Sequence, residues 1–226
     1  MTHLAISSIL WLGACASAVP VHEGTDTVDA AVGRDAAIAI DAPVGDPPPS
    51  TMTLTQSSSS AITPASSVAC IQAGSARETS YYRVFRIADH AITTPFTPQQ
   101  VTFGVQQVAG THAVQVKLHT LVGALTVDHL TPIASTAVAV DASKGGQLLS
   151  TAISSFSILA DATLVAEILV ADGPGTGRQF LLGANAAAET QPGYIRSPAC
   201  GTPNPSTLAS IGFPDAHIVL TVTGTR

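Results

Sequence analysis

Charged side chains are scarce in this sequence, where they make up 11% of the 226 residues, well below the quarter that is usual for a soluble domain. Aromatic residues make up 4%, and lysine occurs only as Lys117 and Lys144. No cluster of basic residues is present, so the sequence gives no electrostatic support for binding nucleic acid. The abundance of Thr, Ser, Gly and Val favours a β-rich extracellular protein over a helical cytosolic one.

Familiar catalytic motifs are missing as well. The sequence has no Gly-x-Ser-x-Gly elbow, no His-Glu-x-x-His pair and no Gly-Lys-Ser/Thr phosphate loop. Gly173, Gly175 and Gly177 form a glycine-rich stretch, but it lies between two predicted strands and therefore indicates a hairpin loop. We expect a non-catalytic domain, and a hydrolase whose site is assembled from dispersed residues is the alternative.

The first 14 residues are typical of a signal peptide. Residues 4–14 are mostly apolar, and such a run is too short to span a bilayer, which takes about 20 residues. The sequence Leu-Gly-Ala-Cys that ends at Cys15 resembles the lipobox of bacterial lipoproteins. This resemblance implies that Cys15 is acylated and anchors the protein in a membrane. Ala16 in place of Asp then implies sorting to the outer membrane and the cell surface. An ordinary secretory leader with an unmodified Cys15 is the alternative.

Residues 15–50 predict a disordered acidic tether. Six of the fifteen acidic residues precede residue 51, and an Asp-Ala pair recurs every six residues before the triple proline 47–49. The segment has too little apolar surface to offset the conformational entropy that folding would remove. A transient helix over residues 29–42 is the alternative, but Gly33 and the lack of a 3.6-residue period argue against it.

Three cysteines are present, and if Cys15 carries lipid, Cys70 and Cys200 remain as the two that one disulfide requires. Export into an oxidising compartment would permit that bond. A bond between Cys70 and Cys200 would close a loop of about 130 residues. In the chain-entropy model, closing such a loop would stabilise the fold by roughly 4–5 kcal/mol. Two free buried thiols are the alternative.

Residues 51–226 predict a single all-β domain, an antiparallel β-sandwich or jelly roll. Residues 114–119 alternate between apolar and polar side chains, which is typical of a half-buried strand. Residues 164–170 are nearly all apolar, with Glu167 as the one charge, and predict a central strand. Further strands are expected at residues 51–55, 81–87, 101–106, 136–140, 178–183 and 217–223, separated by turn signals such as that at residues 201–203. At most a turn of helix is expected at residues 184–189.

Several of these segments also resemble an uncharacterised β-sandwich domain that recurs in secreted bacterial proteins. The resemblance is carried by residues 80–85, 101–105, 164–168, 183–195, 198–201 and 211–219, and it covers roughly residues 62–224. Such domains usually stand beside adhesive or carbohydrate-active modules. The resemblance therefore implies an adhesive or ligand-binding module with a glycan or a surface protein as its ligand. A structural component of the cell envelope is the alternative.

Side chains in the predicted loops and strands offer a few candidate ligand contacts. The oxygen donors that would suit a structural calcium ion are Asp172, Asn185, Glu189 and Asp215. None of the seven histidines has the His-x-His spacing of a strand-borne metal site, so we expect them to be exposed strand or loop residues. The three tyrosines, which are expected to be buried on strands unless they stack on a sugar ring, are Tyr81, Tyr82 and Tyr194.

Overall fold

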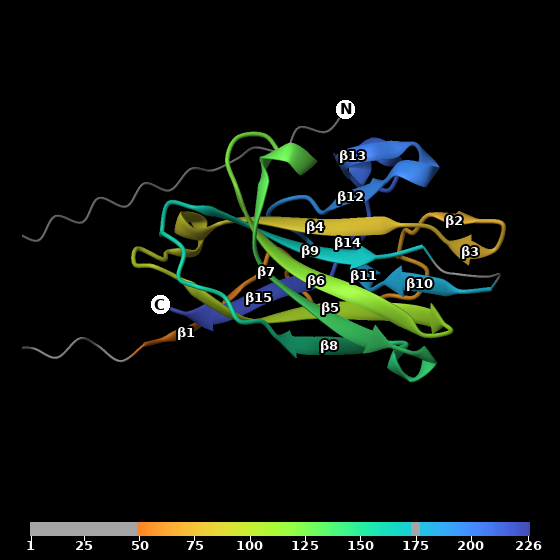
Figure 1. Cartoon of the computed structure of the whole chain (residues 1–226), viewed down its shortest axis with the longest axis horizontal. Coiled ribbons are helices and arrows are strands. Elements are labelled where there is room, and N and C mark those ends of the chain that lie inside the picture. The colour runs from red at the N-terminus through yellow and green to blue at the C-terminus, as the bar shows by residue number, and fades with distance from the viewer. Residues whose placement is uncertain (1–48, 173–176) are drawn as a thin grey trace, which may run out of the picture. The chain divides into compact units, whose positions relative to one another are not determined.

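Alternating apolar residues build two antiparallel sheets in the computed structural model, which describes residues 49–172 and 177–226 (Figure 1). These residues belong to one structural unit, Pro47–Arg226. The predicted signal peptide, Cys15 and the tether up to residue 48 lie outside the described residues, as do Gly173 and Gly175. In the described ranges no helix is long and apolar enough to cross a membrane.

The larger sheet has six strands. Their order across the sheet is β13 (Thr202–Thr207), β12 (Tyr194–Ser197), β4 (Thr79–Arg86), β9 (Thr163–Val170), β6 (His112–Leu121) and β7 (Leu130–Val140). Every neighbouring pair is antiparallel. The central position predicted for residues 164–170 is confirmed, because β9 pairs with β4 on one side and with β6 on the other.

The second sheet has five strands. Four of them lie in the order β1 (Thr51–Leu54), β15 (Leu220–Thr225), β5 (Thr97–Ala109) and β10 (Gln179–Leu182). The fifth strand, β8 (Gln147–Ala152), also pairs with β5. Two small pairs join β11 (Ala184–Asn185) to β14 (His217–Ile218) and β2 (Ile71–Gln72) to β3 (Ser75–Ala76). The five short 3₁₀ turns are η1 (Ile87–His90), η2 (Val127–His129), η3 (Ala142–Lys144), η4 (Pro198–Cys200) and η5 (Ala209–Ile211).

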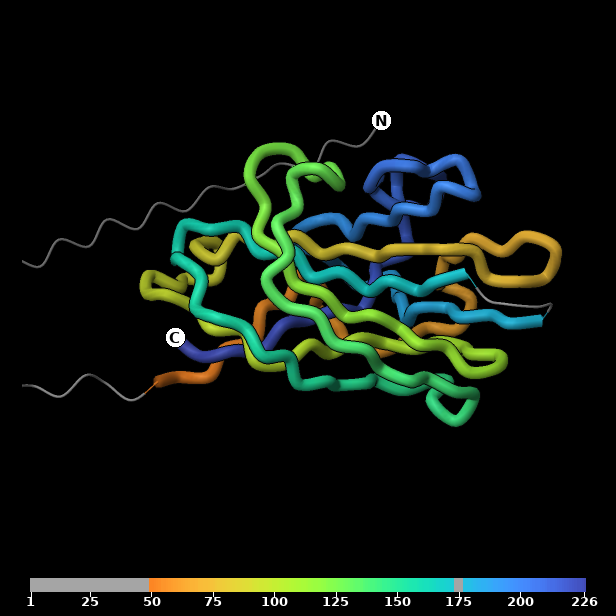
Figure 2. Tube along the Cα trace, in the orientation of Figure 1, coloured from red at the N-terminus to blue at the C-terminus, as the bar shows by residue number. Residues whose placement is uncertain are grey.

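Both sheets contribute side chains to one hydrophobic core, which confirms the predicted β-sandwich. Val116 and Leu118 of β6 pack in the same cluster as Phe103 of β5 and Val222 of β15, and all four are fully buried. Each such side chain stabilises the fold by roughly 1.5–3 kcal/mol relative to exposure in water. The chain passes from one sheet to the other where β7 ends, turns through η3 and returns as β8 (Figure 2).

One close approach of two backbones requires glycine. The Gly183 amide donates a hydrogen bond to the Gly104 carbonyl oxygen over 2.8 Å. A Cβ atom at Gly183 would lie 2.8 Å from the backbone of Gly104, closer than real Cβ contacts come. The absence of a side chain therefore lets the end of β10 cross β5 at this point.

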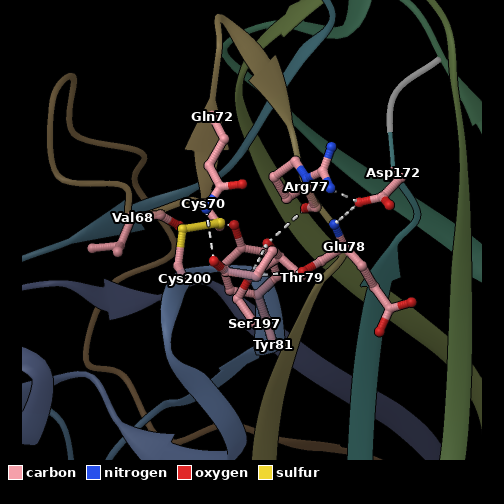
Figure 3. Close-up of a disulfide and its surroundings, with 11 residues drawn as sticks. Val68, Cys70, Gln72, Arg77, Glu78, Thr79, Tyr81, Asp172, Ser197 and Cys200 are labelled. Carbon is pink, nitrogen blue, oxygen red and sulfur yellow. Dashed lines mark hydrogen bonds and ion pairs between the residues drawn. A yellow bond between two sulfur atoms is a disulfide. The ribbon is translucent and has the colours of Figure 1, made fainter.

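The disulfide between Cys70 and Cys200 is present, as predicted (Figure 3). It joins the segment before β2 to η4, which connects β12 and β13. Beside it, the Gln72 side-chain amide donates to the carbonyl of Ala199 over 2.7 Å. The same contacts tie the β2–β3 hairpin to the outer strands of the six-stranded sheet.

Two predicted segments were wrong, and three strands of the two large sheets were not predicted. Residues 184–189 do not form a helical turn, because Ala184 and Asn185 pair with β14 as strand β11. The predicted turn at residues 201–203 is limited to Gly201, since β13 begins at Thr202. The prolines of β13 argued against a strand, but they are tolerated because β13 is an edge strand with one unpaired side. The unpredicted strands are β8, β12 and β13.

Candidate functional site

A row of polar side chains crosses the outer face of the six-stranded sheet. Lys117 of β6 lies opposite Glu167 of β9, and Glu167 lies opposite Tyr82 of β4. Tyr194 of β12 follows next to Tyr82. Because side chains alternate along a strand, these residues point away from the core that Leu118 and Ala166 enter. Glu167 and Tyr82 are nevertheless buried, at 6% and 2% exposure.

Glu167 is the centre of this row. Nε2 of His119 donates a hydrogen bond of 2.8 Å to its Oε2 atom, and Nζ of Lys117 lies 3.9 Å from the same atom. Burial alone would raise the pKa of Glu167, but the hydrogen bond from His119, the nearby hydroxyl of Ser80 and the charge of Lys117 outweigh that effect and lower the pKa below its ordinary value. The carboxylate is therefore held ionised in a buried position.

Tyr82 stays protonated beside that carboxylate. Burial raises the pKa of its phenol strongly, and the negative charge of Glu167 raises it further. Its hydroxyl is thus a neutral hydrogen-bonding group at any physiological pH. The row combines a fixed acceptor, Glu167, with a fixed donor, Tyr82.

Two polar atoms at this place lack partners. Nδ1 of His119 is buried and has no hydrogen-bond partner among the described residues, and the same holds for Oγ of Ser80. The Ser80 hydroxyl faces Glu167, but its geometry is outside that of a formed hydrogen bond. Buried polar atoms are hydrogen-bonded in the great majority of cases, so orphaned atoms on one sheet face call for a functional explanation.

A hollow of about 680 Å³ opens over this row. Its polar side is formed by β4, β6 and β9, and its rim carries the ion pair between Arg196 Nη1 and Glu78 Oε1 at 2.8 Å. Its other side is apolar and comes from β7 and η2, with Val127, Leu130, Pro132, Ile133 and Ala134. The volume falls within the range of small-molecule sites, which are also largely apolar with a few placed polar groups.

A β-bulge shapes the apolar wall. The register between β6 and β7 shifts after Leu118, which pairs with Ala134, while His119 pairs with Pro132. Ile133 is therefore an extra residue on β7, next to the orphaned histidine. Bulges bend a strand and redirect its side chains, and they are common beside functional sites.

The arrangement does not form a Ser-His-acid triad. Ser80 and His119 lie on β4 and β6, on opposite sides of Glu167, which is on the strand between them. Within the described residues no hydroxyl or thiol is hydrogen-bonded to Nδ1 of His119. The chemistry that the site does offer is hydrogen bonding to a ligand by several preplaced donors and acceptors.

The four candidate calcium ligands do not come together. Asp172 Oδ1 accepts a hydrogen bond from the Glu78 amide at 2.5 Å, and the Asn185 amide group donates to the carbonyl oxygens of Ser59 and Ala61. Asp215 lies in the loop before β14. In the part of the chain that the structure describes, no three His, Cys, Asp or Glu side chains lie close enough to hold a metal ion.

Glu189, the fourth candidate, is already paired. Arg83 extends from β4 into the sandwich at 1% exposure and donates from Nη1 to Glu189 Oε2 over 2.7 Å. The guanidinium also donates to the carbonyl oxygens of Gln191 and Ile218. Burial lowers the pKa of Arg83, and Glu189 opposes that shift. This buried pair holds the loop at residues 189–191 and β14 against β4.

The expectation that all histidines are exposed was wrong for His112 and His119, at 5% and 7% exposure. His112 packs beside the ring of Phe180, and its Nε2 hydrogen-bonds with the carbonyl of Ala109. Sequence reasoning also missed the pairing of His119 with Glu167. The signal was the single charge in an apolar strand, because a buried carboxylate needs a partner on the next strand.

Two of the three tyrosines are buried on a strand, as expected, and the third is partly exposed. Tyr81 and Tyr82 are buried on β4, and the hydroxyl of Tyr81 donates to the carbonyl of Val68. Tyr194 is only partly buried and lines a hollow on the outer face. Tyr194 is therefore the tyrosine whose side chain is partly accessible from outside.

No protein-family model and no curated protein sequence matches the chain. Similar solved structures include the cysteine protease and lectin-like domains of Cwp84, a surface layer associated protein of Clostridium difficile, with a TM-score of 0.49, 12% identity and coverage of 67% of this chain. A clostridial Cwp84 structure after propeptide cleavage has a TM-score of 0.47 at the same identity and coverage. A structure of infectious bursal disease virus, Gx strain, has a TM-score of 0.29 at 12% identity and covers 79% of this chain. The chain spans 33–36% of these structures' own length, and likenesses at this level assign no function.

Proposed function

We propose that the folded domain is the ligand-binding module of an exported, lipid-anchored surface protein, and that its ligand is a neutral, hydroxyl-rich molecule of the glycan class. The observation that carries this proposal is the row of Tyr82, Glu167 and Lys117. It is polar and mostly buried under a hollow, on a sheet face that in a sandwich is ordinarily solvated.

The charges around the hollow favour a neutral ligand. Glu167 is paired with Lys117 and hydrogen-bonded to His119, and Glu78 is paired with Arg196. A charged ligand would have to break one of these pairs and leave a charge uncompensated, which is costly in a buried place. A hydroxyl group of a neutral ligand donates and accepts hydrogen bonds without breaking these ion pairs.

The two unlike walls favour a ligand with one apolar and one polar face. Val127, Leu130 and Ile133 provide apolar contact, while Glu78, Lys117 and Arg196, which are partly exposed, provide hydrogen-bonding atoms opposite. A sugar ring has this character, because its C–H face is apolar and its hydroxyl groups point outward.

Export and anchoring rest on the sequence at Cys15 and on the disulfide. The Leu-Gly-Ala-Cys motif supports lipidation of Cys15 and an outer-membrane location. The disulfide between Cys70 and Cys200 is chemically suited to an oxidising compartment. Mass spectrometry of membrane-extracted protein should find an acylated N-terminal Cys15, whereas an unmodified residue in a soluble fraction would remove the anchor.

A glycan array with the full chain tests the binding function. We expect binding to neutral glycans, and we expect Val127→Asp to weaken it by at least about tenfold, because the substitution places a charge in the apolar wall. Val122→Asp is the matched control, since Val122 lies in the same loop, is 81% exposed and lines neither large hollow of this face. Binding to no glycan, or equal binding by both variants, would contradict the proposal.

A further inference from the structure

A second large hollow lies on the same outer face of the six-stranded sheet. It has a volume of about 630 Å³ and is lined by β4, β9, β12 and the loop after β6. A smaller hollow of about 250 Å³ adjoins it and shares the side chains of Arg86, Asp89 and Tyr194. The outer face is therefore hollowed along its strands at more than one place.

The register of the strands gives the spacing between the hollows. Arg86, Thr163 and Leu121 form one cross-strand row that lines the second hollow. Thr163 and Glu167 are four residues apart on β9, which corresponds to about 13 Å along a strand. One sugar ring does not reach across that distance, but a short chain of sugars does.

A single loop borders both hollows. Val127 of η2 lines the first, while Gly123 and Leu125 line the second. Figure 1 shows this loop between β6 and β7, in green, rising at the top of the view. A ligand that contacts the whole loop would therefore occupy both hollows.

The second hollow offers hydrogen-bonding groups that have no ion-pair partner among the described residues. Arg86, Asp89 and Asp161 are exposed, and none of them forms an ion pair with another described residue. The partly exposed ring of Tyr194 adds a flat surface with a polar end. Carboxylates, a guanidinium and a tyrosine ring are a suitable set of contacts for the hydroxyl groups and the C–H face of a sugar.

We propose that the two hollows are successive subsites for one extended ligand, so that the domain binds the interior or end of an oligosaccharide chain in preference to a single sugar. This inference rests on the proposed function. It adds that the ligand extends from the first hollow to the second, and it assigns Arg86 and Tyr194 to recognition of the second sugar unit.

Calorimetric titration of the full chain tests the inference, with neutral glucose, N-acetylglucosamine and mannose oligosaccharides of increasing length, starting from the single sugars. We expect the affinity to rise with length and to level off once both subsites are filled. Arg86→Ala should lower the affinity for the longer chains by about tenfold and leave the affinity for the single sugar unchanged, and Tyr194→Ala should lower the affinity for the longer chains to a similar extent. Arg178→Ala is the control, because Arg178 lines neither hollow.

The two proposals fail in different ways. If single sugars bind as tightly as long chains and neither Arg86→Ala nor Tyr194→Ala has an effect, the second subsite is wrong while the binding function stands. Arg86 is exposed, so its variant keeps the test valid if Tyr194→Ala does not fold. If neither the array nor any oligosaccharide series shows binding, the proposed function itself is wrong.

Discussion

The outer faces of the two sheets are built differently. On the five-stranded sheet, neutral side chains satisfy one another across strands: the hydroxyl of Thr53 hydrogen-bonds with that of Thr223 at 2.8 Å, and Thr102 with Ser150 at 2.7 Å. On the six-stranded sheet, Glu167 is buried among ionisable and orphaned polar groups. We call the first face the hydroxyl face and the second the hollowed face.

The difference lies in how each face satisfies its polar groups. Cross-strand hydroxyl pairs contribute roughly 0.2–1 kcal/mol each and remain in contact with water, so they leave nothing to be satisfied. A buried carboxylate costs free energy unless it is paired, and the pairing on the hollowed face leaves Nδ1 of His119 without a partner. The hollowed face therefore carries a free-energy cost that the hydroxyl face does not.

The largest effect should come from the disulfide, which ties the segment before β2 to η4, between β12 and β13 of the six-stranded sheet. The double variant Cys70→Ser, Cys200→Ser should lose about 4 kcal/mol of unfolding free energy, because the unfolded chain gains the freedom that the closed loop removed. Urea denaturation measures the loss, and hydrogen exchange locates it. Exchange should rise more in β12 and β13 than in β1 and β15, and an equal rise in all four strands would contradict this division of the faces.

The next effect should come from Glu167. Glu167→Ala removes the carboxylate between Lys117 and His119 and should cost about 3 kcal/mol of unfolding free energy. Thr102→Ala is the matched change at the centre of the hydroxyl face and should cost roughly 0.5 kcal/mol. Chemical denaturation at neutral pH measures the unfolding free energy of both variants. Similar losses would show that the two faces do not differ in how much a buried polar contact contributes to stability.

The two faces should also differ in how their contribution to the unfolding free energy depends on pH. The pKa of Glu167 is lowered in the folded protein, so the stability that it contributes is present above the unfolded pKa, about 4.3, and is lost as the pH falls through the folded value. The difference in unfolding free energy between the wild type and Glu167→Gln should be constant near neutrality and should narrow below about pH 4. The same difference for Thr102→Val should not depend on pH, because neither side chain titrates.

The smallest effect is expected at the edge of the hydroxyl face. Thr223→Val keeps the shape of the side chain and removes the hydrogen bond to Thr53, so the unfolding free energy should fall by about 0.5 kcal/mol or less. Thermal unfolding measures it. A loss as large as that of Glu167→Ala would mean that the hydroxyl face also depends on a specific polar contact.

Most strands could be predicted because each has a local pattern of apolar residues. The disulfide could be predicted from the number of cysteines. Residues 114–119 alternate strictly, residues 164–170 are apolar on both faces apart from Glu167, and two cysteines remain for one bond. β8 escaped prediction because its sequence Gln-Leu-Leu-Ser-Thr-Ala does not alternate and its pairing with β5 depends on the tertiary fold. β13 escaped because it contains two prolines, which only its edge position permits.

The candidate site could be predicted only in part. Glu167 was conspicuous as the one charge in its strand, but its partners are set by a register that no local pattern reveals. The hollow depends on the extra residue Ile133, whose bulge is a property of how β6 and β7 pair. A site assembled from β4, β6, β7 and β9 therefore becomes visible only when the strands are placed side by side.

Hydrogen exchange of the full chain, measured with and without the glycan that the array identifies, tests most directly whether the hollowed face binds the ligand. Binding there should slow exchange in the loop between β6 and β7 and in the adjoining ends of β6, β7 and β9, and it should leave β1, β8 and β15 unchanged. Slowed exchange confined to β1, β8 and β15 would contradict the central claim, because it would place the ligand on the hydroxyl face.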